Sequence, residues 1–192
     1  MDLYELIIRR RSIRKFAQKK IGITTLKKII DAGRLAPSAA NLQFIEYVVI
    51  SEKTILDEVF RYTNWAAYLP ACKPNQEQMP ACFIAVLINK DKSRMPDLRD
   101  VGAACQNIML AAQSFGISSC WLGAIDKIEV TKILKLPKNI LLDSLIAIGY
   151  GTEYPRLVNS DRDIKYWIDK TGQFFVPKRK LSSIMHLNRY VK

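Results

Sequence analysis

The stretch that decides the fold of this chain is Ala36-Pro37-Ser38-Ala39-Ala40-Asn41-Leu42-Gln43. It follows a helical pattern and precedes an apolar run, so it predicts a loop of small residues between a helix and a strand. Small residues let a backbone come close to a flat ligand. The side chains of Ser38, Asn41 and Gln43 can hydrogen-bond ring heteroatoms without adding charge. The stretch therefore indicates a binding loop, although an ordinary polar turn has a similar composition.

An upstream segment carries three guanidinium groups and one hydroxyl within five residues, at Arg10, Arg11, Ser12 and Arg14. A helix is expected from Asp2 to Arg9, directly before this segment. Guanidinium groups match phosphate oxygens in pairs, and a loop after a helix can fold such residues around one phosphate. The segment indicates a phosphate site, and a basic surface turn is the alternative.

The composition is that of one globular domain over residues 1–192. Hydrophobic residues make up 49% of the chain, which is enough for a core. No apolar run approaches the roughly 20 residues of a membrane helix, and the first residues carry no signal-peptide pattern. We therefore expect a cytoplasmic protein without a membrane partner. The only histidine is His186 and no C-x-x-C pair occurs, so neither a Ser-His-Asp triad nor a metal site is expected.

The net charge of +12 allows two interpretations. It fits an anionic partner such as a flavin phosphate, a nicotinamide dinucleotide or nucleic acid, and it also fits a solvated lysine-rich surface. Basic residues are densest at 9–15 and 178–180. Because no nucleic-acid motif accompanies them, nucleic acid is not the expected partner.

Hydrophobic periodicity predicts one central sheet in a layered architecture with helices. Strands are expected at residues 44–50, 81–88, 118–122 and 141–148. Further helices are expected from Thr24 or Thr25 to a point before Pro37, after a cap at Ser51, over residues 96–115, and from Asp126. The second of these strands is apolar throughout, which is typical of burial on both faces.

Two expected strands end in glycine, and such strand ends are candidate binding elements. Gly123 follows the strand 118–122, so backbone N–H groups there could face a ligand, and a plain strand end is the alternative. Gly149-x-Gly151 lacks the third glycine of a dinucleotide fingerprint, and Pro155 follows where a helix should begin. We therefore do not expect a Rossmann dinucleotide site.

Together, these segments resemble the nitroreductase family of FMN-dependent oxidoreductases over nearly the whole chain. The segments that carry the resemblance are residues 10–16, 35–43, 102–112, 116–123, 148–151 and 176–181. Each is modest by itself, but their number and order are specific. Residues 65–69 and 165–180 further resemble a subgroup of small members.

The resemblance implies an α/β (α+β) protein with a three-layer fold, in which helices flank a central mixed sheet. It also implies a homodimer with two FMN sites at its interface. Residues 152–192 are polar, aromatic and poor in core residues. They are expected to form a C-terminal extension that wraps the partner subunit and can add a strand to its sheet.

The resemblance also assigns the cofactor site. The residues expected to bind FMN are Arg10, Arg11, Ser12, Arg14, Pro37, Ser38, Asn41, Gln43, Cys120, Trp121, Leu122, Gly123, Lys178 and Arg179. The basic segment of one subunit would hold the phosphate and one flavin edge, and the loop of small residues, from the other subunit, would line the ring and the ribityl chain. The strand end, residues 120–123, would lie beside the flavin edge, where a main-chain N–H can face N5. The two tail residues would be basic phosphate contacts.

The chain departs from the usual family pattern beside the expected substrate pocket. Phe44-Ile45 stand where many members have proline and an aromatic residue, and Trp121-Leu122 stand where some members have a carboxylate. Trp65, Tyr68 and Trp121 could form aromatic walls of the pocket, and packing in the core is the alternative.

The implied function is an NAD(P)H-dependent FMN oxidoreductase. FMN takes a hydride at N5 from NADH or NADPH and passes electrons to an electron-poor small molecule such as a nitroaromatic or quinone. A cation near the pyrimidine side of the ring stabilises the reduced flavin, and Arg14 is the expected cation. The alternatives are a flavin-binding or flavin-sensing protein with little turnover, and a specialised member that dehalogenates its substrate or consumes the flavin.

Overall fold

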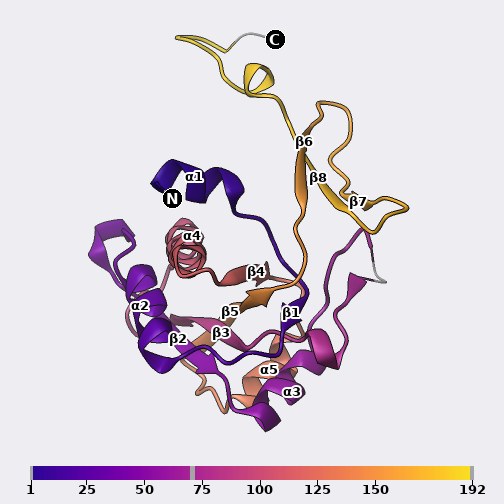
Figure 1. Ribbon diagram of the computed structural model, residues 1–192. Helices are drawn as coiled ribbons and strands as arrows, with labels where there is room; N and C mark the ends of the chain where they lie inside the picture. Colours follow the sequence, from indigo (N-terminus) through magenta and orange to yellow (C-terminus); the bar gives the residue numbers. More distant parts are fainter. Residues whose placement is uncertain (1, 70–71, 191–192) are drawn as a thin grey trace.

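The fold is built on a five-stranded sheet whose strands run in the order β1-β5-β3-β2, with β4 also paired to β5 (Figure 1). The computed structural model describes residues 2–69 and 72–190 of the expected single domain. The strands are β1 Phe16–Ala17, β2 Ile45–Ile50, β3 Cys82–Asn89, β4 Ser118–Leu122 and β5 Ile140–Gly151. All ladders between the strands of this sheet are antiparallel, and its one parallel pairing among the described residues is an isolated bridge between Ser12 and Ser119, outside the strands.

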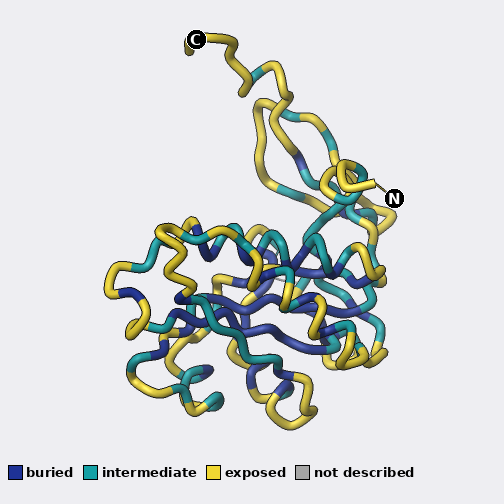
Figure 2. The backbone as a smooth tube through the Cα atoms, turned by 90° about the vertical axis from the view of Figure 1, so that its left-hand side faces the viewer, coloured by how far each residue is buried: buried dark blue, intermediate teal, exposed yellow. Residues whose placement is uncertain are grey.

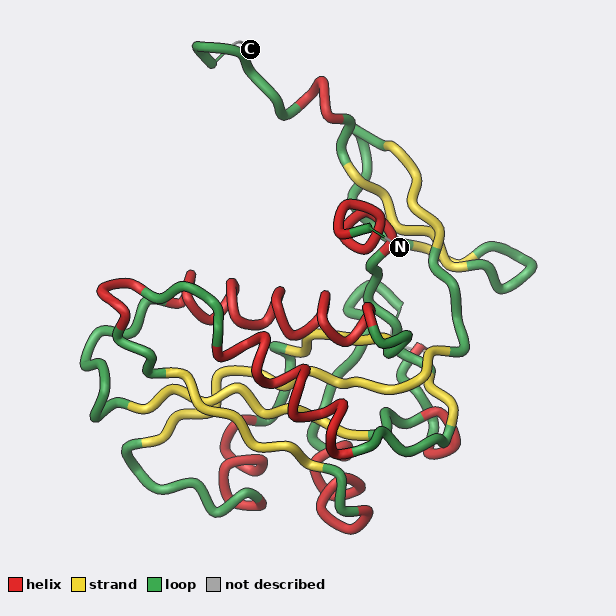
Figure 3. Tube along the Cα trace, turned by 60° about the vertical axis from the view of Figure 1, so that its left-hand side comes forward, coloured by secondary structure: helices red, strands yellow, loops and turns green. Residues whose placement is uncertain are grey.

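Helices cover both faces of the sheet, as the sequence predicted. They are α1 Leu3–Arg9, α2 Ile23–Arg34, α3 Lys53–Arg61, α4 Leu98–Ser114 and α5 Lys127–Ile133. Figure 3 shows two of them, α2 and α4, on one face of the sheet, and the short α3 and α5 lie on the other (Figure 1). None of the described helices is long and apolar enough to cross a membrane.

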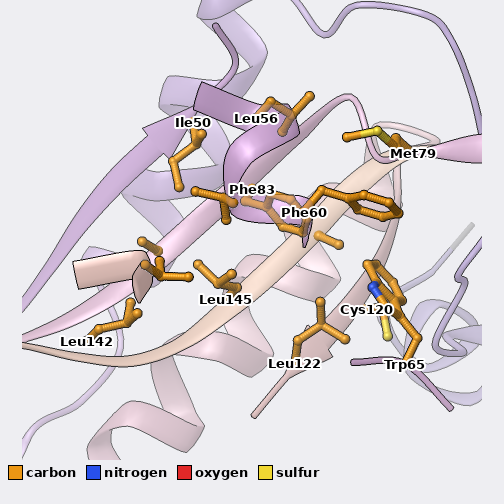
Figure 4. Close-up of a cluster of buried hydrophobic side chains, with 14 of the residues drawn as sticks. Ile50, Leu56, Phe60, Trp65, Met79, Phe83, Cys120, Leu122, Leu142 and Leu145 are labelled. Carbon is orange, nitrogen blue, oxygen red and sulfur yellow. The ribbon is translucent and has the colours of Figure 1, made fainter. Parts of the chain in front are cut away.

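The strand β3 divides the core into two halves, because its side chains alternate between the faces of the sheet. Phe83, Ala85 and Leu87 pack with residues of α3 and α5 in one cluster, which Figure 4 shows in part. Ile84 and Val86 pack on the opposite face with residues of α2 and α4. The prediction of a strand buried on both faces is confirmed, and each half of the core supports one helical layer.

Local signals predicted most element ends, with small errors. Asp2 caps α1 by accepting a hydrogen bond from the Glu5 N–H. The predicted cap at Ser51 is wrong, because the carboxylate of Glu52 accepts the N–H groups of Thr54 and Ile55. The helix α2 begins at Ile23, one or two residues before the predicted start at Thr24 or Thr25.

Gly149 and Gly151, which do not complete a dinucleotide motif, have a packing role at the end of β5. A Cβ atom at Gly149 would lie 2.8 Å from the Phe16 ring, and one at Gly151 would lie 2.6 Å from Ser118 Oγ. Since Phe16 pairs with Gly151 in the sheet, the glycines let β1 and β4 both approach β5. Their presence is explained by close backbone packing.

The segment after residue 151 leaves the main body and forms a small sheet that the sequence did not predict. Its strands are β6 Arg156–Asn159, β7 Trp167–Ile168 and β8 Phe174–Lys178, in the order β6-β8-β7, and a short 3₁₀ turn covers Leu181–Ser183. Figure 2 shows this C-terminal extension projecting from the body with mostly exposed residues. Such a surface is expected of a segment that packs on another molecule.

Candidate active site

A cavity of about 240 Å³ lies at the carboxyl end of β4, where three distant segments meet. Its lining residues are Ser12, Arg14, Asn64, Trp65, Ala66, Ala67, Cys120, Trp121, Leu122, Gly123 and Ala124. The structure thus brings together the basic segment and the strand end that the sequence singled out separately. A third segment, residues 64–67, supplies the remaining wall.

The basic segment is fixed to the body on two sides. The Ile13 N–H donates to the Ser119 carbonyl at 3.0 Å, which seats the segment along β4. On the other side, the Arg14 N–H donates to a Glu153 carboxylate oxygen at 2.6 Å. These bonds hold the backbone at Ser12 and Arg14 in place, so that both residues reach the cavity.

The guanidinium groups of this segment have no carboxylate partner within 4 Å among the described residues. Burial lowers the pKa of Arg10 and also that of Arg11, where the neighbouring Arg10 charge acts in the same direction. Removing a cation from water without a counterion is unfavourable, so the segment favours an anionic ligand.

Arg11 differs from its neighbours in its orientation. Its Nη1 donates to the carbonyls of Ile8 at 2.8 Å and Arg10 at 2.6 Å, so it binds the last turn of α1. Its buried Nε has no partner among the described residues. Neither Arg10 nor Arg11 lines the cavity, and both remain predictions as cofactor contacts.

The strand end contributes backbone donors and apolar surface. Among the described residues, the N–H groups of Gly123 and Ala124 donate no hydrogen bond, although both residues line the cavity. Cys120 and Leu122 are buried in the core cluster behind it. Burial raises the pKa of the Cys120 thiol to about 11, so this wall is uncharged at neutral pH.

Of the three aromatic residues predicted to line the substrate pocket, Trp65 and Trp121 line this cavity and Tyr68 does not. Trp65 lines the cavity but is only 5% exposed, and its Nε1 donates to Thr63 Oγ1 at 2.8 Å. It packs in the same core cluster as Cys120 (Figure 4). Trp121 lines the cavity while its Nε1 donates to Ser144 Oγ at 2.7 Å. Tyr68 does not line the cavity, and its ring lies 5.0 Å from that of Tyr166.

Sequence reasoning missed Asn64, the amide side chain in the cavity wall. The backbone N–H of Asn64 donates to the Ala124 carbonyl at 2.9 Å, which joins residues 64–67 to the strand end. A lone asparagine in an irregular segment gives no sequence signal, because its neighbours in the cavity come from residues far away in the chain.

The loop of small residues lines a second cavity, of about 110 Å³, that includes Pro37, Ser38 and Gln43. Three of its residues adopt left-handed backbone conformations, with φ of 49° at Ala40, 55° at Asn41 and 49° at Gln43. Such conformations cost free energy outside glycine and persist only where the surroundings fix them.

Two side-chain oxygens accept backbone N–H groups of the loop and help to fix it. The Gln43 N–H donates to Ser38 Oγ at 3.2 Å, and the Ala39 N–H donates to the Asp100 carboxylate at 2.9 Å. Asp100, at the start of α4, is only 8% exposed. Sequence reasoning missed it, although a single carboxylate in the first turn of a mostly apolar helix was a signal available to it.

The two cavities lie at opposite edges of the sheet. The loop of small residues leads into β2, whereas the basic segment lies along β4, and β3 and β5 separate these strands. At about 4.8 Å per strand, the two edges are about 14 Å apart. Within one chain, the two predicted halves of the cofactor site therefore line separate cavities.

The two basic residues of the C-terminal extension lie apart from the cavity lining. Lys178 ends β8, and Arg179 Nη2 donates to the Ser183 carbonyl at 2.7 Å. Their role as phosphate contacts remains a prediction.

Comparison with known proteins agrees with this architecture. The family model described as "Nitroreductase family" matches residues 7–150. A relative from Archaeoglobus fulgidus, named "Putative NADH dehydrogenase/NAD(P)H nitroreductase", is 31% identical over 83% of this chain and 91% of its own. A nitroreductase family structure from Clostridium difficile 630 superposes with a TM-score of 0.73 over 99% of this chain and 100% of its own, at 23% identity. A structure from Desulfovibrio desulfuricans, solved in complex with FMN, gives 0.71 over 100% and 99%, at 22% identity.

Proposed function

Because this chain belongs to the nitroreductase family, we propose that it passes electrons from NADH or NADPH, through N5 of bound FMN, to an electron-poor acceptor such as a nitroaromatic or quinone. It is an NAD(P)H-dependent oxidoreductase with FMN as its cofactor. FMN supplies the redox chemistry, and the protein supplies binding, orientation and electrostatics. The observation that carries the proposal is the cavity in which the Arg14 guanidinium, without a carboxylate partner among the described residues, meets an apolar strand end whose N–H groups at Gly123 and Ala124 donate no hydrogen bond there.

The cavity residues fit FMN by their chemistry. The strand end offers apolar surface for a planar ring and, at Gly123 and Ala124, N–H groups that can donate to ring heteroatoms. The basic segment offers the Arg14 guanidinium, which has no carboxylate partner among the described residues, for a phosphate or for the electron-rich edge of the ring. Asn64 adds an amide that can donate and accept.

Arg14 is the residue we assign to charge stabilisation. It is the only arginine among the residues that line the cavity. Its positive charge would stabilise negative charge on the reduced ring, and preorganised charge in a cavity acts more strongly than in water. This role needs no histidine in the site.

A homodimer would complete the cofactor site. The loop with Pro37, Ser38 and Asn41 lies too far along the sheet to share the first cavity within one chain, so a second copy would supply it. Leu35 and Leu42, on either side of this loop, are 64% and 42% exposed, which supports contact with another surface. In this assembly the extension 152–192 would wrap the partner, and the unpaired outer edge of β2 could receive a strand from it.

The first experiment is a visible spectrum of the purified protein, followed by addition of NADPH or NADH without oxygen. A yellow protein that bleaches supports the proposal and identifies the electron donor. A yellow protein that resists both donors supports the alternative of a flavin-binding protein with little turnover. A colourless protein that takes up no added FMN contradicts both.

The same assay tests Arg14. We expect Arg14→Ala to weaken FMN retention or slow flavin reduction, because it removes the cation of the cavity. Arg61→Ala, at the exposed end of α3, changes the net charge equally and should leave both unchanged. Unchanged values for both quantities in Arg14→Ala would remove Arg14 from the site.

A further inference from the structure

The C-terminal extension contacts the candidate site of its own chain through two aromatic rings. The Arg14 guanidinium carbon lies 5.1 Å from the centre of the Tyr166 ring and 5.2 Å from that of Phe174. We infer that Tyr166 and Phe174 are positioning residues, which hold the Arg14 guanidinium for its role against the flavin. This inference rests on the proposed function and adds to it residues from outside the cavity.

The two rings pack against each other and against the body of the protein. They stack on each other with centres 5.5 Å apart and an angle of 26° between their planes. Phe174 is only 4% exposed, although it belongs to neither core cluster of the body. The Tyr166 hydroxyl accepts the Tyr68 N–H at 3.3 Å, and the rings of Tyr68 and Tyr166 also touch. The pair is therefore anchored to the segment that supplies the third cavity wall.

The guanidinium depends on these rings because it has little else to orient it. Its only hydrogen bond among the described residues is a long one of 3.5 Å from Nη1 to the Ser12 carbonyl. The nearby Glu153 accepts the backbone N–H of Arg14, and within residues 2–69 and 72–190 no carboxylate lies within 4 Å of the guanidinium.

Aromatic rings and a carboxylate would have different effects on this cation. A carboxylate would hold the guanidinium but would also offset its charge and occupy its donors. The faces of Tyr166 and Phe174 attract it through the ring quadrupole and leave the N–H edge free. The extension therefore orients Arg14 while its full charge remains available to a ligand.

The test uses the flavin-loaded protein and sulfite, which adds to flavin N5 and places negative charge on the pyrimidine side of the ring. The affinity for sulfite, read from bleaching of the flavin absorbance, reports the cation without any electron donor or acceptor. We expect Tyr166→Leu and Phe174→Leu each to weaken sulfite affinity about three- to tenfold, which lies within the roughly two- to thirtyfold effect of one cation–π contact. Tyr166→Phe keeps the ring and should restore most of the affinity.

A double-mutant cycle separates positioning from a general effect on the fold. In an Arg14→Met background, Tyr166→Leu should cause no further loss of sulfite affinity, because the group that it positions is gone. The same loss in both backgrounds would overturn the inference, as would unchanged affinity in both leucine variants. If the unmodified protein holds FMN and binds sulfite, these outcomes concern the two rings alone. A protein that holds no FMN would instead contradict the proposed function.

Discussion

At the scale of single residues, both predicted binding segments are held by carboxylates from other parts of the chain. Glu153 accepts the Arg14 N–H, and Asp100 accepts the Ala39 N–H in the loop of small residues. The sequence patterns identified the segments by their own composition, because ligand-facing residue types are recognisable in a short window. They did not identify the two carboxylates, since each acts through a backbone group more than 60 positions away.

Asp100→Ala should therefore weaken FMN binding as well as the fold. Removing the carboxylate leaves the Ala39 N–H without its acceptor, and the loop loses a bond that fixes its left-handed backbone. We expect a loss of about 1–3 kcal/mol in the free energy of unfolding, and a weaker affinity for FMN in a fluorescence titration.

The matched control is Asp97→Ala in the same helix. Asp97 caps α4 by accepting the Arg99 N–H, and its side chain makes no hydrogen bond to the loop among the described residues. Its loss should therefore cost about 1 kcal/mol and leave FMN affinity unchanged. Equal FMN affinity in the two variants would show that Asp100 does not support the loop.

At the scale of elements, the periodic signals were reliable where an element is buried on a regular face. The buried strand β3 and the long helix α4 lie within one or two residues of their predicted bounds. The crossing of α2 and α4 was not predictable from the sequence, because it depends on contacts between residues of the two helices that are far apart along the chain. A Cβ at Gly33 in α2 would lie 2.7 Å from two atoms of the fully buried Ile108.

Gly33→Ala and Gly102→Ala test this crossing as a pair. Alanine favours a helix over glycine by about 1 kcal/mol, but at Gly33 the new methyl group would force the two helices apart. We expect Gly33→Ala to lower the free energy of unfolding in urea by about 1–3 kcal/mol. Gly102 in α4 has no atom within 4 Å of an added Cβ, so Gly102→Ala should raise it by up to about 1 kcal/mol.

Each of the two variants can contradict this account of the helix crossing. A neutral Gly33→Ala variant would mean that the two helices separate without cost. A destabilising Gly102→Ala variant would show that α4 packs on a surface that the single chain does not contain, which is what a homodimer through this helix would provide.

At the scale of the whole molecule, the C-terminal extension ends in apolar side chains that the single chain leaves exposed. Leu181, Ile184, Met185, Leu187 and Tyr190 are all at least half exposed at the end of the extension. The two halves of the expected cofactor site also lie at opposite edges of the sheet. A second copy of the chain would cover these exposed apolar side chains. It would also bring together the two halves of the cofactor site, one from each copy.

In the proposed homodimer, truncation after Lys180 should therefore remove the contact and leave a monomer, as measured by sedimentation or light scattering of both the full-length and the truncated protein. The removed apolar side chains would supply much of the contact with the partner, whereas both core clusters of the body remain intact. Full-length protein with Ile128→Ser, a 70% exposed side chain on α5, should stay dimeric. A truncated protein that is still a dimer would place the interface on the body instead.

The sequence by itself determined the layered class, four strands of the main sheet, most helix ends and the two short segments suited to a flavin. These depend on hydrophobic periodicity, capping and residue type, which act within a few positions along the chain. Only the tertiary structure decided that the basic segment meets β4 and Asn64, that Asp100 fixes the distant loop, and that Tyr166 and Phe174 cover Arg14. These contacts join residues far apart in sequence, and they form because packing the sheet between its helices brings those residues together.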